Sequence, residues 1–197
     1  MTALGGPPAP VVEPAGPIPE NGRRAKAGRL PRPTRLLAGI AAGLLLAGSM
    51  PPRTAWYLGP LGAAVLTWSL LGLGWRQRLV LGGMTGLAFF VPTLNWLTGF
   101  HPAGFVALLV LEVVLFAVAM LVVDARPGRW WTVPAALVAL EAVRARFPFG
   151  GFPIPGLALG QLDGPFAAAA PLGGSLLVVW LAIGAGAAAT ALLAAGR

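Results

Sequence analysis

Long apolar segments separated by short stretches rich in glycine, proline and arginine dominate the chain from residue 36 onward. Three of these segments, 56–75, 79–99 and 103–123, are 20 or 21 residues long. A helix of this length crosses about 30 Å of hydrocarbon, so each is predicted to span a membrane. The pattern is that of a polytopic membrane protein.

Three further apolar segments are less regular in length. The runs 36–49 and 130–143 have 14 residues each, and the last run, 166–195, has 30. The short segment 130–143 can be extended by Arg144 and Arg146, whose long side chains can snorkel to the interface. The long segment 166–195 can start within the preceding loop or run tilted. The predicted fold is therefore all-α, a polytopic integral membrane protein with about six transmembrane helices in residues 36–197.

Residues 1–35 precede the first apolar run and differ from the rest. They hold eight of the 20 prolines and six basic residues. Such a stretch buries too little apolar surface to offset its ordering entropy, so we expect a disordered basic tail. A basic region before a short apolar run is also typical of a secretory signal peptide, with cleavage near Ala47-Gly48-Ser49. The apolar segments that follow favour an uncleaved first membrane helix.

Composition and charge agree with a membrane protein. The chain is 57% hydrophobic and 10% charged, with a mean hydropathy of +0.79. Its net charge of +8 lies in the tail and at the ends of apolar segments, which is a topology signal and not a nucleic-acid footprint. With the N-terminus inside, eleven basic residues face the cytoplasm and three, Arg53, Arg144 and Arg146, face outward. Both termini are therefore expected in the cytoplasm.

The segment before the last apolar run, 147–174, cannot form a regular helix throughout. It carries Pro148, Pro153 and Pro155 within eight residues, and each proline removes a backbone donor. Apolar, non-helical backbone between membrane helices is tolerated where it is buried in protein or lines a wet cavity. Two interpretations follow: a proline-rich connector, or a re-entrant or interfacial loop that shapes a lipid-facing site on the outer face.

Four short motifs follow one another in this region: Glu141 with Arg144, then Gly151-Phe152-Pro153, Gln161-Leu162-Asp163-Gly164-Pro165 and Ala170-Pro171-Leu172-Gly173-Gly174. In their order and in most of their spacings they resemble the membrane domain of apolipoprotein N-acyltransferase. The upstream stretch 90–99, with Asn95 and Trp96, also looks like that family's third membrane segment. The chain departs from the family pattern at Ile154, where tryptophan is usual, at Gly160, where serine is common, and by one extra residue between Arg144 and Gly151.

The resemblance implies a two-step acyl transfer in the bacterial plasma membrane. A cysteine thiolate of a periplasmic nitrilase-like domain, helped by Glu and Lys, takes an acyl group from a phospholipid and passes it to the amino group of a diacylated lipoprotein. This chain has no cysteine, and its single lysine, Lys26, lies in the tail. We therefore expect no catalytic residue and no cofactor here. The chain is expected to be an N-terminal membrane domain, truncated or separately encoded, that positions lipid.

Charged residues inside the apolar segments are candidate site residues. Glu112 lies near the middle of 103–123, where it must face the bundle interior, pair with another group or be protonated. It is either a proton or headgroup site, or an interhelical partner of a group such as Thr93, Asn95 or Trp96. Glu141 and Arg144 are three residues apart, so they share a helix face and can pair. They could equally hold the following loop or meet a headgroup.

The remaining candidates concern lipid. Arg144 or Arg146 would meet a phosphate, for which the planar guanidinium is suited. Phe149, Phe152 and Pro153 would shape the loop. The six acidic residues show no metal-ligand spacing, and the expected partners are phospholipid, a diacylated lipoprotein and the nitrilase-like domain.

Two rival functions stay open at this point. The first is a membrane anchor that docks a cytoplasmic polyprenol-phosphate mannosyltransferase through the basic tail, a glycosyltransferase partner. The second is a small transporter, for which Glu112 is the supporting feature.

Overall fold

The computed structural model describes residues 31–148, 150–151 and 156–196. Most of the predicted tail and the loop candidates Phe149, Phe152 and Pro153 lie outside these residues. Within the described parts all regular structure is helical, as the sequence predicted, and there is no strand. The elements are α2 (Pro33–Ser49), α3 (Leu58–Leu70), α4 (Trp75–Leu94), η1 (Asn95–Gly99), α5 (Pro102–Val122), α6 (Thr132–Arg144), η2 (Leu157–Gln161), η3 (Pro165–Ala169) and α7 (Ala170–Ala195).

Three helical stretches of the described chain are long and apolar enough to cross a membrane. They are Trp75–Gly99, Pro102–Val122 and Pro165–Ala195. α2 and α3 are apolar but have only 17 and 13 residues, and α6 also has 13. The predicted all-α fold is thus confirmed with three candidate membrane spans, and six crossings stay a prediction.

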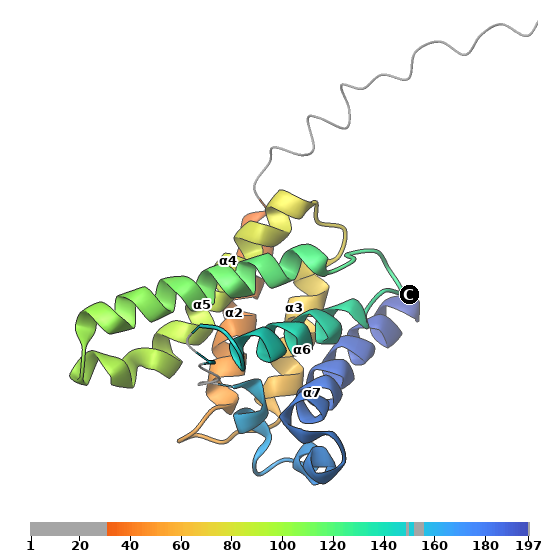
Figure 1. Ribbon diagram of the computed structural model, residues 1–197. Coiled ribbons are helices and arrows are strands. Elements are labelled where there is room, and N and C mark those ends of the chain that lie inside the picture. Colours follow the sequence, from red (N-terminus) through yellow and green to blue (C-terminus); the bar gives the residue numbers. More distant parts are fainter. Residues whose placement is uncertain (1–30, 149, 152–155, 197) are drawn as a thin grey trace, which may run out of the picture.

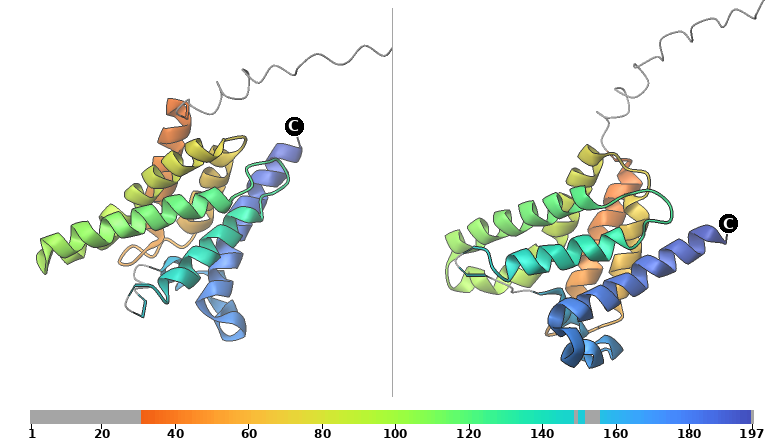
Figure 2. Two further views of the ribbon diagram at one scale, coloured as in Figure 1. Left: turned by 45° about the horizontal axis from the view of Figure 1, so that its top comes forward. Right: turned by 45° about the vertical axis from the view of Figure 1, so that its right-hand side comes forward.

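The helices form one bundle in which α2 and α4 connect its two sides (Figure 1). α2 packs against both α3 and α4, α4 packs against α5, and α3 packs against α7. α6 lies between α5 and α7. The hairpin of α4 and α5 extends beyond the other helices, toward the left of Figure 1 and again in both views of Figure 2.

Glycines allow the closest helix contacts. A Cβ at Gly43 of α2 would collide with the backbone carbonyl oxygen of Thr85 in α4. A Cβ at Gly186 of α7 would collide with the carbonyl oxygen of Pro60 in α3. Backbones that approach this closely gain van der Waals contact, which is the main source of helix association in lipid.

The outer surface of the bundle is apolar as well as its core. The buried core includes Leu46, Leu66, Phe89, Phe116 and Met120. α5 also exposes a valine at every fourth position of one face, at 106, 110, 114, 118 and 122. A helix that is apolar on all sides is typical of a buried or membrane environment, so this face fits contact with lipid tails.

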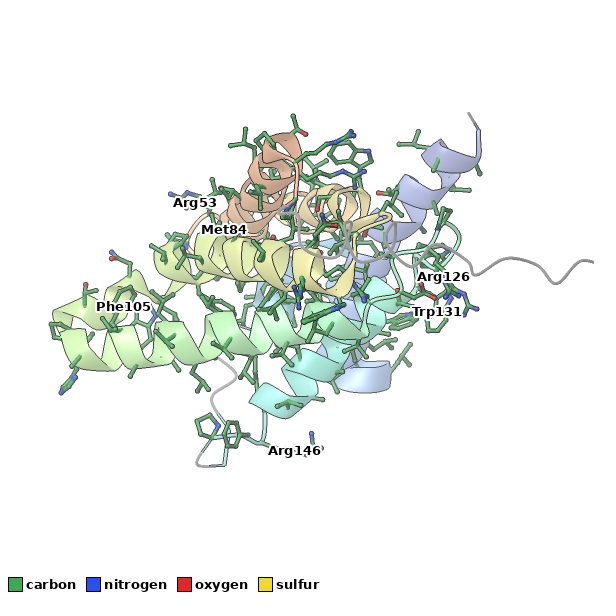
Figure 3. All side chains as sticks on the ribbon, turned by 90° about the horizontal axis from the view of Figure 1, so that it is seen from above. Arg53, Met84, Phe105, Arg126, Trp131 and Arg146 are labelled. Carbon is green, nitrogen blue, oxygen red and sulfur yellow. The ribbon has the colours of Figure 1, made fainter. Side chains whose placement is uncertain are left out.

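The bundle has two ends of different character. We call the start of α2, residues 71–74 and 123–131 and the last turns of α7 the basic end, and residues 50–57 and 145–169 the loop end. At the basic end, the Gly72 N–H donates to the Ala125 carbonyl at 2.8 Å. At the loop end, Gln161 Nε2 donates to the Trp56 carbonyl at 3.1 Å. Figure 3 shows Arg126 and Trp131 in one region and Arg146 in another.

The segment between α6 and α7 is more regular than predicted. Its described part contains two short 3-10 helices, η2 and η3. Non-helical angles at Gly173 and at Gly174, where φ is 64° and ψ is −163°, interrupt α7. The uninterrupted part of the last helix therefore begins at Ser175, nine residues after the start of the predicted segment 166–195.

Candidate functional site

A buried arginine joins two glutamates at the loop end of the bundle. Arg144 is the last residue of α6, and Glu141 lies one turn before it. The Arg144 Nε atom is 2.6 Å from Oε2 of Glu112 in α5, and its Nη1 atom is 2.6 Å from Oε1 of Glu141. We call Glu112, Glu141 and Arg144 the charge cluster. It connects α5 to α6 through one guanidinium.

The cluster is shielded from its surroundings. Arg144 is 1% exposed, Glu112 2% and Glu141 7%. The centre of the Arg144 guanidinium also lies 5.3 Å from the ring centroid of Phe90 in α4. An unpaired charge in such a place would cost several kcal/mol, so the three side chains depend on one another.

The sequence predicted one of these two pairs. The expected pair of Glu141 and Arg144 is confirmed by their contact. The partners expected for Glu112 were wrong. Thr93 donates its hydroxyl to the Phe89 carbonyl in its own helix at 2.7 Å, and Asn95 and Trp96 are exposed in η1.

The place of Glu112 along α5 explains the difference. Glu112 is ten residues from Pro102, where α5 begins, which corresponds to about 15 Å along the helix axis. α6 ends beside it, level with the middle of α5 and not with the tip of the α4–α5 hairpin. The chain after Arg144 therefore leaves α6 level with the middle of the hairpin, and the hairpin projects past this point toward the left of Figure 1.

The charge cluster also holds the loop that follows. The backbone of Leu157, the first residue of η2, stabilises the charge of the Glu141 carboxylate. The backbone N–H groups of Arg146 and Phe147 donate to the Val143 carbonyl, each at 2.9 Å. Both sides of the 149–155 stretch are thus fixed to the C-terminal end of α6.

A second anchor lies on the other side of η2. The buried Gln161 side chain donates to the Trp56 carbonyl. A Cβ on Gly160 would collide with the Ser49 hydroxyl oxygen, and one on Gly164 would approach atoms of the Trp56 side chain within 2.9 to 3.2 Å. The motif around Gln161 is therefore packed tightly against the connection between α2 and α3.

The two arginine candidates for a lipid phosphate differ in access. Arg144 is buried and paired, so the headgroup contact expected of it does not fit this geometry. Arg146 is exposed, and one of its guanidinium nitrogens donates to the Ala142 carbonyl at 3.0 Å. Phe147, beside it, exposes 55% of its surface. A basic and an apolar side chain therefore lie together at the surface of the loop end.

Comparison with known proteins decides the family. The model of the apolipoprotein N-acyltransferase N-terminal domain matches residues 42–188. The chain belongs to this family. The apolipoprotein N-acyltransferase of Mycolicibacterium smegmatis (strain ATCC 700084 / mc(2)155) is 35% identical over 169 residues. That alignment covers 82% of this chain and 28% of the relative, so the chain spans a little over a quarter of that protein's length.

The family assignment agrees with the apolar helices. An apolipoprotein N-acyltransferase N-terminal domain with three helices able to cross a bilayer is a membrane protein. The matched residues 42–188 include the whole charge cluster and the described parts of the loop. The resemblance of the short motifs between Glu141 and Gly174 therefore identified the correct family.

Proposed function

We propose that this chain serves phospholipid-to-lipoprotein N-acyl transfer in lipoprotein maturation by holding acyl chains at its loop end. The observation that carries the proposal is the position of the charge cluster. It fixes the beginning of the loop at the level of the middle of α5 and binds η2 through Leu157. A loop held at this depth, next to apolar helices, is a suitable surface for lipid.

The exposed residues of the loop end and of the first turn of α7 support the same role. Phe147, Leu159, Leu162 and Leu172 are exposed apolar side chains, and Leu172 exposes 84% of its surface. Arg146 supplies an accessible guanidinium beside them. Acyl chains would contact the apolar side chains while a phosphate meets Arg146, because Arg donors match phosphate oxygens in geometry and charge.

The proposal includes an orientation in a bacterial plasma membrane. The basic end and the first turn of α4 together carry six of the nine described arginines, so this end would face the cytoplasm together with the N-terminus. The loop end would then face outward. α2, α3 and α6 would complete a multi-pass arrangement of six crossings, with turns and loops at their ends making up for their short lengths.

The chain's part in the chemistry would be to bind and orient substrates. Its 197 residues contain no cysteine, so the thiol of the family reaction would come from a nitrilase-like domain outside them. This fits the status of an N-terminal part of a longer or divided enzyme. The transporter alternative depended on Glu112, and the ion pair with Arg144 accounts for this residue without a transported ion.

Photolabelling of the purified chain in vesicles tests the proposal. We expect a phospholipid with a diazirine near its headgroup to label residues 146–172 in preference to the valine face of α5. A synthetic diacylated lipopeptide should compete with the label, and the same peptide without acyl chains should not. Arg146→Gln should reduce labelling, whereas Arg53→Gln, an exposed arginine at the same end, should not. Labelling spread evenly over the apolar surface would refute the proposal.

A further inference from the structure

An apolar cleft lies at the basic end, away from the loop end. It has a volume of about 580 Å³ and is bounded by the end of α3, residues 127–130 and the last turns of α7. Leu71, Trp130, Ala191 and Ala194 line it. A second hollow of about 440 Å³ shares Leu71 and Ala194 with the cleft and reaches Trp68. Both volumes are in the range of pockets that bind small ligands.

The sequence of α7 explains why this space is open and apolar. Its last turns are rich in alanine, so their side chains do not fill the volume next to α3. Thr190 of α7 and Thr67 of α3 are polar residues in the lining. The Thr67 hydroxyl donates to the Ala63 carbonyl in its own helix at 2.7 Å, and the Thr190 hydroxyl donates to the Ala64 carbonyl of α3 at 2.9 Å. That bond fixes the two helices together and satisfies the hydroxyl. The remaining lining is suited to a hydrocarbon chain.

Two arginines flank the cleft-lining residues Pro127, Gly128 and Trp130 in the connection between α5 and α6. The side chains of Arg126 and Arg129 are 80% and 53% exposed. Asp124 lies 3.7 Å from Arg126 Nε and 3.9 Å from Arg129 Nε, so this connection carries a net charge of +1. The Arg129 guanidinium also lies 5.9 Å from the ring of Trp131. Arginine next to tryptophan is typical of the region where lipid headgroups begin.

A similar arrangement flanks the second hollow. Arg35 donates from Nη1 to the carbonyls of Trp68, Ser69 and Leu71, each at 2.9 Å. Its guanidinium lies 5.0 Å from the Trp68 ring. The positive charge is thus held at the C-terminal end of α3, beside an apolar space. Both hollows therefore combine an apolar interior with a cationic edge.

We propose that the basic end binds an anionic phospholipid, with an acyl chain in the cleft between α3 and α7 and its phosphate at Arg126 and Arg129. Charge complementarity selects this occupant. A zwitterionic lipid fits the apolar part equally well but carries no net negative charge to meet the arginines. The site lies at the opposite end from the proposed substrate surface, so it does not depend on the proposed function.

The test compares lipid retention by native mass spectrometry of the purified whole chain in detergent. Phosphatidylglycerol and phosphatidylcholine are the two probes. We expect stronger retention of phosphatidylglycerol, and a loss of about fivefold in its apparent affinity for each of Arg126→Gln and Arg129→Gln. Asp124→Asn should instead raise retention, because it removes the negative charge between the two arginines. Arg53→Gln, at an exposed arginine of the loop end to which no lipid contact is assigned, is the matched control and should leave retention unchanged.

A cleft variant separates the acyl-chain part of the proposal from the charge part. Ala191→Leu narrows the cleft and should reduce retention of both lipids by a similar factor. Equal retention of the two lipids by the unchanged chain would overturn the proposal. So would phosphatidylglycerol retention that falls as much in the Arg53→Gln control as in the Arg126 and Arg129 variants.

Discussion

At the residue scale, the central feature is that one guanidinium serves two buried carboxylates. Arg144 approaches Glu112 through Nε and Glu141 through Nη1. A lysine has a single ammonium in place of this planar fork and could not reproduce both contacts in the same geometry. Because the cluster has two acids and one base, the loss of stability depends on which of its members is removed.

We predict that Arg144→Met destabilises the chain much more than Glu112→Gln. Removal of Arg144 leaves two carboxylates buried without a counter-charge, which costs about 3–5 kcal/mol. Removal of the Glu112 charge leaves Arg144 paired with Glu141, and the cluster is then neutral. Thermal unfolding of the purified variants in detergent measures the difference.

Arg146→Met is the matched control because Arg146 is exposed and lies two residues further along. Surface substitutions of this kind change stability by about 0.5 kcal/mol or less. If Arg144→Met and Arg146→Met unfold at the same temperature, the charge cluster does not stabilise the fold. A larger loss in Glu112→Gln than in Arg144→Met would also contradict the account.

The sequence predicted this site only in part, for a physical reason. The spacing of Glu141 and Arg144 within one helix fixes their contact, because residues three apart share a helix face. The contact of Arg144 with Glu112 joins two helices, and sequence alone gives no vertical register between α5 and α6. The signal that could have found it was the need of Glu112 for a cation, since Arg144 ends the following helix.

At the element scale, η2 is held by close packing against the end of α2. Gly160 faces the Ser49 side chain, and a Cβ there would overlap with the Ser49 hydroxyl. That hydroxyl donates to the Leu46 carbonyl at 2.7 Å, so it cannot turn away freely. Gly160 therefore has to lack a side chain, because the Ser49 side chain occupies the space beside it.

We predict that Gly160→Ala destabilises the chain by about 1–3 kcal/mol, the usual cost of overpacking. Ser49→Gly in the same chain should recover a large part of the loss, because it removes the colliding hydroxyl. Unfolding of the single and double variants in detergent measures the coupling. Equal losses in Gly160→Ala with and without Ser49→Gly would show that the two sites are independent.

The existence of the helices was easier to predict than their ends and interruptions. The predicted segment 79–99 begins four residues earlier as α4, where the Gly74 N–H donates to the Gln77 side chain at 3.2 Å. Arg76 and Arg78 thus lie in the first helical turn and not in a loop. The break at Gly173 and Gly174 was missed because the apolar pattern continues through both glycines.

At the scale of the whole molecule, the chain is a helical bundle with two chemically different ends. Hydrogen bonds join the start of α2 to residues 71–74, and residues 71–74 to residues 123–131, at the basic end. These segments are far apart in the chain. The positive charges predicted this grouping. The projection of the α4–α5 hairpin past the end of α6 was not predictable, because it depends on the position of each helix along the axis of its neighbour.

Labelling of single introduced cysteines tests the central claim, that the two ends lie on opposite sides of the membrane with the loop end outside. The chain has no cysteine of its own, so each variant reports one position. In right-side-out vesicles, a membrane-impermeant maleimide should label Arg146→Cys and leave Gly128→Cys unlabelled until detergent is added. In inside-out vesicles the two should exchange behaviour. Labelling of both positions from the same side would contradict the account.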